Sequence, residues 1–346
     1  MAGNDVAVTL SEVARHAGVS LATASRALNG SARRVTPELQ GRVLASAAAL
    51  GYAANAQAQA VARGTSRTVA VVLGDIADPY FSAIASGIIR VAEDRRLVVT
   101  MAVTHSGIDR ELATLAALKG QRPCALIMAA SRRIDEDSDA RAMAELAAIE
   151  RMGGRVSFIG SAPPGFRAVI VRNRRAAGAL AEALVGRGYR DFAVLAGPAE
   201  LVTPAERAAG FVESLAAHGL APASGRVVNG AFTRDGGFQA MNGLLTAGIR
   251  PDCVFAVTDV MAVGVMAALR SHGLESGRDV AVAGFDDIQM LQDVTPSLTT
   301  VALPLIEMGA GALELALDVD PPSSPPRMIV EGRVVLRGST PGVRRR

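Results

Sequence analysis

From Thr68 onward, short apolar runs alternate with longer amphipathic stretches, and this alternation limits the fold more than any other feature. The apolar runs are typical of buried strands, whereas stretches such as 81–94 and 205–218 have helical spacing. This order favours a doubly wound parallel sheet, and it continues too long for one sheet, so we expect two similar lobes. The predicted strands are 69–73, 97–103, 124–129, 156–159, 168–171, 192–196, 227–228, 253–257, 280–283 and about 327–335.

Three short helices are predicted before the alternation begins. A capping box over Thr9–Glu12 starts the first, and Gly18 ends it. Ser20 can cap a second helix that closes at Asn29-Gly30, and Thr36-Pro37 opens the third. Apolar residues at helical spacing are expected to face one small core: Leu10, Val13, Ala14, Ala17, Ala24, Ala27, Leu28, Val43, Leu44, Ala47 and Leu50.

Two short helices joined by a glycine turn favour a helix-turn-helix, whose second helix lies in a DNA major groove. Hydroxyls at Ser20, Thr23 and Ser25 suit phosphate contacts, and Arg26 has no acidic residue three or four places away. Residues 1–67 carry seven Arg against three acidic residues, a net +4, so the remainder of this +3 chain sums to −1. The alternative is a plain three-helix mini-domain.

Several classes of protein are disfavoured by the composition. Two cysteines, Cys124 and Cys253, give no disulfide framework, and no Cys/His cluster predicts a metal. The N-terminus lacks an apolar leader, and the most apolar window, 253–269, contains Asp259 and is too short for a membrane helix. No dinucleotide, P-loop or nucleophile-elbow motif is present. We therefore expect a soluble cytoplasmic protein that has no cofactor and is not an enzyme.

Many spaced residues of the first domain agree with one known pattern. They are Thr9, Leu10, Val13, Ala14, Ala17, Gly18, Val19, Ser20, Thr23, Ser25, Arg26, Leu28 and Asn29, continued by Val35, Thr36, Leu50, Gly51, Tyr52 and Asn55. On these residues the chain resembles the lactose/galactose repressor (LacI/GalR) family of transcriptional regulators.

The resemblance implies which residues meet DNA. Leu21 and Ala22 would read bases, Arg26 would read a further base, and Val61 stands where the family has a leucine that wedges into the minor groove. The remaining predicted DNA-contact residues would lie on or near the backbone: Thr9, Ser20, Thr23, Ser25, Asn29, Tyr52 and Asn55. The chain departs from the family pattern at Ala24, Ala54 and 58–61, so the use of a hinge helix and wedge stays open.

The body resembles the family's effector-binding core, which is similar to periplasmic sugar-binding proteins. The resemblance rests on the stretches 78–82, 207–211, 258–264, 284–287 and 296–301. It implies one cleft at the carboxyl ends of the strands, with Phe232 placed to stack on a sugar. The predicted effector-binding residues are Asp78, Tyr80, Phe81, Arg207, Phe232, Thr258 and Asp286. Four of them have a structural alternative: a turn for Asp78, a helix cap for Asp286, core for Phe232, and a surface helix for Arg207.

One departure bears on the effector. The family often has Asp-Asn where this chain has Arg172-Asn173, followed by Arg174 and Arg175. An arginine near the cleft would favour an anionic effector such as a sugar acid or phosphate. The alternative is a set of exposed arginines at a helix start.

The expected organisation is a helix-turn-helix domain at 1–54, a hinge at 55–66 and a two-lobed effector-binding and dimerisation domain at 67–340. The lobe boundary is expected near residue 161, with crossovers near 285 and 320. The expected function is a homodimeric transcriptional regulator, most simply a repressor, that binds a pseudo-palindromic DNA operator and responds to a small sugar-like effector. The alternatives are a ligand-sensing protein without specific DNA binding, and an enzyme.

Overall fold

The computed structural model describes residues 8–29, 35–53, 66–104, 107–318 and 325–343. The chain divides into two compact units, Met1–Ser66 and Arg67–Arg346. We call them the head and the body and describe each by itself. No helix in these described ranges is long and apolar enough to cross a membrane.

The described residues of the head form three helices packed on one core. Its helices are α1 (Leu10–His16), α2 (Leu21–Asn29) and α3 (Pro37–Ala49), and the Thr9–Glu12 capping box is present at the start of α1. The buried core is close to the predicted one: Val13, Ala14, Ala17, Ala24, Ala27, Val43 and Ala47. The prediction was wrong for Leu44, which is 49% exposed. It follows Val43 directly, and adjacent helical residues do not share a face, so Ser46 is buried on that side instead.

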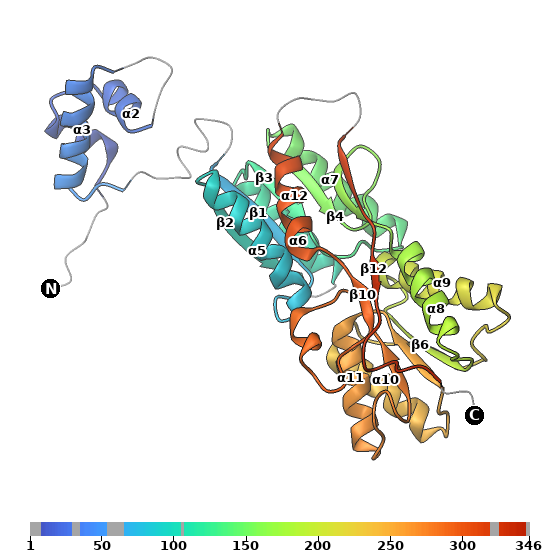
Figure 1. Cartoon of the computed structure of the whole chain (residues 1–346). Helices are drawn as coiled ribbons and strands as arrows, with labels where there is room; N and C mark the ends of the chain where they lie inside the picture. The colour runs from blue at the N-terminus through green and yellow to red at the C-terminus, as the bar shows by residue number, and fades with distance from the viewer. Residues whose placement is uncertain (1–7, 30–34, 54–65, 105–106, 319–324, 344–346) are drawn as a thin grey trace, which may run out of the picture. The chain divides into compact units, whose positions relative to one another are not determined.

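The first lobe of the body is built on a six-stranded parallel sheet (Figure 1). Its strand order is β11-β5-β4-β3-β1-β2. The strands are β1 (Thr68–Leu73), β2 (Val98–Val103), β3 (Ala125–Met128), β4 (Arg155–Ile159), β5 (Arg167–Val171) and β11 (Arg327–Val330). The associated helices are α5 (Pro79–Asp94), α6 (Ile108–Gly120), α7 (Glu136–Arg151) and α12 (Leu305–Leu317).

The second lobe repeats the arrangement on a smaller, four-stranded parallel sheet with the order β7-β6-β8-β9. Its strands are β6 (Phe192–Gly197), β7 (Val227–Asn229), β8 (Cys253–Ala256) and β9 (Ala281–Ala283). Its helices are α8 (Asn173–Gly186), α9 (Val202–Ala217), α10 (Arg234–Thr246) and α11 (Asp259–Ser271). The two lobes are linked by an antiparallel ribbon of β10 (Thr300–Ala302) and β12 (Arg333–Val335).

The crossings between lobes correct the sequence prediction. The boundary does not lie near residue 161, because β5 still pairs with β4 in the first sheet and the chain crosses only after Val171. The chain returns over 284–304, before α12 packs on α5. It does not cross near 320, since β11 pairs with β5, and the last crossing is at 331–332. The strand predicted at 327–335 is therefore two strands in different sheets, and β10 was not predicted.

Glycines let three helix pairs pack at backbone contact. A Cβ at Gly210 of α9 would collide with the backbone of Arg174 on α8. In the same way, a Cβ at Gly264 of α11 would meet the backbone of α10, and one at Gly309 of α12 would meet that of α5. The glycines of the 207–211 and 258–264 motifs thus serve close helix packing rather than the cleft.

We predict that Gly210→Ala lowers the free energy of unfolding by roughly 1–3 kcal/mol, because the added methyl overpacks the α8–α9 contact. The matched control is Gly243→Ala on α10, where a Cβ would meet open space. That exposed helical site should gain about 0.5–1 kcal/mol. Urea unfolding measures both, and equal effects would contradict this account of Gly210.

Candidate functional site

A cavity of about 430 Å³ lies between the two lobes of the body. It is lined by segments that follow β1, β3, β4 and β5 in the first lobe and β6, β7, β8 and β9 in the second. This is where parallel α/β sheets bind ligands, outside the carboxyl ends of their strands. All seven residues predicted to bind an effector line the cavity: Asp78, Tyr80, Phe81, Arg207, Phe232, Thr258 and Asp286.

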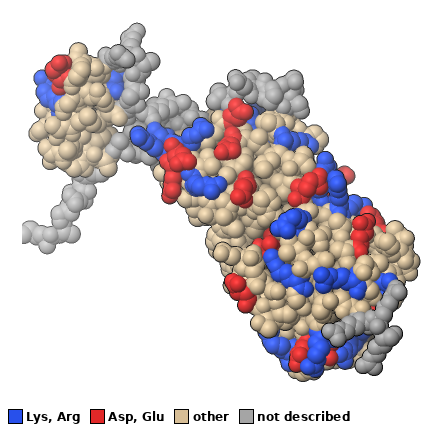
Figure 2. All heavy atoms as spheres, in the orientation of Figure 1, with Lys and Arg blue, Asp and Glu red and all other residues tan. Residues whose placement is uncertain are grey.

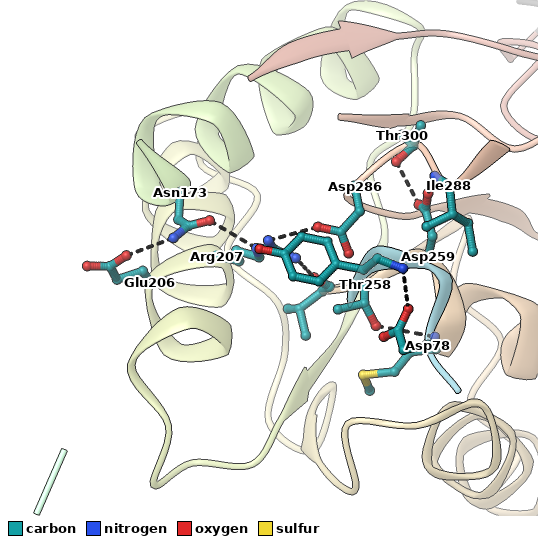
Figure 3. Close-up of polar contacts among 12 residues, drawn as sticks. Asp78, Asn173, Glu206, Arg207, Thr258, Asp259, Asp286, Ile288 and Thr300 are labelled. Atoms are coloured by element: carbon teal, nitrogen blue, oxygen red, sulfur yellow. Dashed lines mark hydrogen bonds and ion pairs between the residues drawn. The ribbon is translucent and has the colours of Figure 1, made fainter. Parts of the chain in front are cut away.

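Arg207 lies in the first turns of α9 and is only 2% exposed. Its buried guanidinium has partners on several sides. Its Nη2 lies 2.9 Å from Oδ1 of Asp286, and its Nη1 donates to the Val257 carbonyl at 2.9 Å. Nε donates to Oδ1 of Asn173 at 3.0 Å, and the guanidinium lies 3.9 Å from the Phe285 ring centre. Figure 3 shows Asn173 and Asp286 converging on Arg207, so Arg207 is not the surface helix residue of the alternative interpretation.

Asp286 meets Arg207 from the segment that returns to the first lobe. It is buried, and its φ of 121° lies in a region that non-glycine residues seldom adopt. Its backbone is fixed by the ribbon, since its N–H donates to the Val301 carbonyl at 2.9 Å. Burial raises the pKa of Asp286, and the Arg207 guanidinium opposes that rise. The carboxylate is held opposite the cation by the surrounding fold.

Two other cavity residues also cap helices. Asp78 is the N-cap of α5 and accepts from the Tyr80 N–H at 2.9 Å, while Thr258 is the N-cap of α11 and accepts from the Met261 N–H at 3.3 Å. Burial raises the pKa of Asp78, and neighbouring Asp75 adds to the rise. Asp78, for which the alternative was a turn, is therefore both a helix cap and a cavity residue, whereas the side chain of Asp286, for which the alternative was a helix cap, meets Arg207. Phe232 is half-buried and packs against the body core.

Sequence reasoning missed other cavity residues. Ser131 and Arg133 follow β3, and Glu200 and Thr203 follow β6. Asn173 is 1% exposed and links Arg207 to Glu206, whose Oε2 accepts from Nδ2 of Asn173 at 3.0 Å. The signal was available, because polar side chains directly after parallel strands are expected at one edge of a sheet.

Arg172, the basis for expecting an anionic effector, is exposed and is not among the residues that line the cavity. Its neighbour Asn173 points inward instead. Arg174 pairs with Glu213 at 2.6 Å, and Arg175 pairs with Glu331 at 3.5 Å. The exposed-arginine alternative therefore describes this stretch.

Asp259, from the 258–264 motif, holds the returning segment rather than a ligand. It is fully buried, and its two carboxylate oxygens accept from the Thr300 hydroxyl at 2.6 Å and the Ile288 N–H at 2.9 Å (Figure 3). Burial raises its pKa to about 6. Thr300, from the 296–301 motif, has the same structural role.

In the head, α2 presents the predicted base-reading residues outward. Leu21 is 51% exposed, and Ala22 and Arg26 are exposed as well. Ser20 caps the helix, since its Oγ accepts from the Thr23 N–H at 3.1 Å. Thr9 is exposed but engaged in the capping box with Glu12. The exposed side chains of α2 form a candidate nucleic-acid interface.

Several predicted DNA contacts stand apart from α2 or cannot be placed. Tyr52 is half-buried against the head core. Ser25 is half-buried in the second turn of α2. Asn55 and Val61 lie outside the described residues, and so does the side chain of Asn29.

On the face that Figure 2 shows, the body carries charges of both signs. Acidic and basic side chains are interspersed there over the lobes. Several of them are paired across elements, as in Arg174–Glu213 and Arg250–Asp279. This mixture agrees with the near-neutral charge of the body.

Two family descriptions match the chain. Residues 9–55 match bacterial regulatory proteins of the lacI family, and residues 181–340 match the periplasmic binding protein-like domain. The HTH-type transcriptional regulator GalS of Salmonella typhimurium is 33% identical over 312 residues, covering 90% of this chain and 89% of that protein.

Two solved structures are similar along nearly the whole chain. The lac repressor dimer bound to operator and an anti-inducer has a TM-score of 0.80 at 27% identity, covering 97% of this chain and 99% of that one. The complex of the transcriptional regulator CelR with cellobiose has a TM-score of 0.69 at 28% identity, covering 96% and 99%.

We predict that Arg207→Met lowers the free energy of unfolding by roughly 3–5 kcal/mol near neutral pH, because it leaves the Asp286 carboxylate buried without its cation. Without the guanidinium the pKa of folded Asp286 rises further above its unfolded value. A group of this kind destabilises the folded state once it is ionised, so the deficit should shrink as pH falls through that raised pKa. Urea unfolding at about pH 5 and about pH 8 measures the difference.

The control for this prediction is the double variant Arg207→Met/Asp286→Asn. It has no buried charge, and asparagine tolerates positive φ. It should recover part of the loss and show no such pH dependence. A deficit in the single variant that is the same at both pH values would exclude the Asp286 charge as its cause.

Proposed function

The chain belongs to the lacI family of bacterial regulatory proteins and is a DNA-binding transcriptional regulator; from this premise we propose that it is a repressor whose operator binding changes when a small sugar occupies the cavity between its lobes. The observation that carries the proposal is the buried Arg207–Asp286 pair, which lies at the wall of the cavity where the chain crosses back from the second lobe. The alternative of a ligand sensor without specific DNA binding is not favoured, and an enzyme does not fit this family.

The charges of the cavity support an uncharged, hydroxyl-rich ligand. Among the described residues, its lining holds five carboxylates, from Asp75, Asp78, Glu111, Glu200 and Asp286, and two guanidinium groups, from Arg133 and Arg207. Carboxylates accept hydrogen bonds from sugar hydroxyls, whereas they repel a phosphate or a sugar acid. Phe232 would supply an apolar wall. The CelR structure with cellobiose supports this class of ligand.

The head would act on DNA through the exposed face of α2, with Arg26 as its donor to a base and Leu21 and Ala22 against thymine methyls. We propose that the regulator is a homodimer, as the lac repressor structure is, and that its operator is therefore pseudo-palindromic. The hinge at 55–66 and a minor-groove role for Val61 are part of the same proposal. Because such a regulator acts on chromosomal DNA, we propose a cytoplasmic location.

We predict that Arg26→Ala weakens operator binding by roughly 1–3 kcal/mol, through one base pair of each half-site, and relaxes specificity there, because the guanidinium is the base-reading donor. The operator is first selected from a random DNA pool and then titrated at fixed salt. The matched control is Arg15→Ala, which removes the same charge from exposed α1. A uniform loss on all sequences for Arg26→Ala would make it a phosphate contact.

We predict that Phe232→Ala raises the sugar concentration for a half-maximal effect on operator affinity by roughly tenfold, since stacking on the sugar is lost. Operator binding without sugar should stay unchanged. A panel of neutral mono- and disaccharides, scored by operator affinity, identifies the sugar to use. Phe238→Ala on α10 is the control, because Phe238 packs under Arg234 and does not line the cavity. If both variants respond like the wild type, Phe232 does not contact the sugar.

A further inference from the structure

Helix α9, which carries Arg207, begins without a cap of its own. Its N-cap residue Leu201 is apolar, and Pro204 in its first turn has no N–H. The N-cap side chains of α5, α7, α10 and α11 do cap their own helices. The first N–H groups of a helix lack intrahelical partners, so those of α9 need acceptors from elsewhere.

The first lobe supplies these acceptors. The Val202 N–H donates to the Arg132 carbonyl at 2.9 Å, and the Thr203 N–H donates to Oγ of Ser131 at 3.1 Å. In return, the Ile134 N–H donates to the Glu200 carbonyl at 2.9 Å. Residues 131–134 and 200–203 thus form a short antiparallel contact between the lobes, which we call the latch.

The first-lobe side of the latch is fixed in place. Asp135 caps α7 by accepting from the Ser138 N–H at 2.9 Å. The guanidinium of Arg132 makes two contacts with the Asp139 carboxylate, one of them from Nε at 2.9 Å. The loop between β3 and α7 therefore presents its carbonyl and hydroxyl acceptors at a set position.

The latch and the Arg207 contacts share one face of α9. Thr203 and Arg207 are four residues apart, which is one helical turn, and both line the cavity. Ser131 and Glu200 line it as well. A ligand in the cavity would lie beside both features.

We propose that the first turn of α9 is a latch between the lobes, capped by the first lobe only while the lobes are closed over the cavity. Separation of the lobes at this edge leaves the N–H groups of Val202, Thr203 and Ile134 without their protein acceptors. The cavity therefore opens to a ligand by uncapping α9. This inference goes beyond the proposed function, and its test uses neither DNA nor sugar.

The deciding variant is Val202→Pro in the full chain. It removes the N–H that donates to the Arg132 carbonyl, while proline suits the first position of a helix. Leu201 is already extended, with φ −104° and ψ 139°, as a residue before proline must be. The readout is residue-resolved hydrogen–deuterium exchange of the ligand-free protein. We expect exchange at the Ile134 amide to become about tenfold faster or more, with amides near Phe211 unchanged.

The matched control is Val202→Ala, which keeps the N–H and should keep the protection of Ile134. Ser131→Ala is a second test that removes the acceptor of the Thr203 N–H, and faster exchange at both Thr203 and Ile134 is expected. If Val202→Pro also speeds exchange near Phe211, proline has disturbed more of α9 than the latch. The exchange rate of Ile134 in Ser131→Ala then decides whether the latch exists. Unchanged protection of Ile134 in Ser131→Ala and Val202→Pro, or a wild-type Ile134 amide that exchanges freely, would overturn the proposal.

Discussion

The buried guanidinium of Arg207 is the interaction on which the site and the junction of the lobes both depend. A charge taken out of water costs several kcal/mol unless it is paired and hydrogen-bonded. Here the partners come from separate segments: Asn173 where the chain has just crossed, Val257 at the end of β8, and Asp286 where the chain turns back. The hydrogen bonds and the ion pair of this one guanidinium therefore hold both crossing segments against α9.

The sequence motifs predicted the cavity well because parallel strands place the residues that follow them at one edge. All seven predicted residues line it, although Asp78 and Asp286 are 208 positions apart in the chain. The motifs did not distinguish the residues that line the cavity from the residues that only stabilise the fold. Arg207 and Gly210 stand in one motif, yet one lines the cavity and the other lets α8 approach α9. Asp259 likewise ties down the returning segment.

The features that escaped prediction depend on contacts between distant segments. Nothing local marks Ser131 as an acceptor for the first turn of α9, because that role exists only once the two lobes meet. Arg172 and Asn173 are adjacent, but the start of α8 turns one outward and buries the other. The apolar stretch at 327–335 read as one strand, whereas the second half of it pairs with β10 in the ribbon.

The Arg207 contacts and the latch differ in strength, and this difference suits a ligand-controlled hinge. The Arg207 contacts involve a buried charge, and breaking them would leave that charge unpaired. The latch consists of neutral hydrogen bonds, each worth about 1 kcal/mol net when water can replace the partner. The lobes should therefore stay joined at the crossing segments beside Arg207 and separate at the latch. A ligand shifts such an equilibrium only through its differential affinity for the two arrangements. A sugar that touched one lobe alone would shift nothing, whereas one that spans from Asp78 to Phe232 would bind both walls only when they are closed.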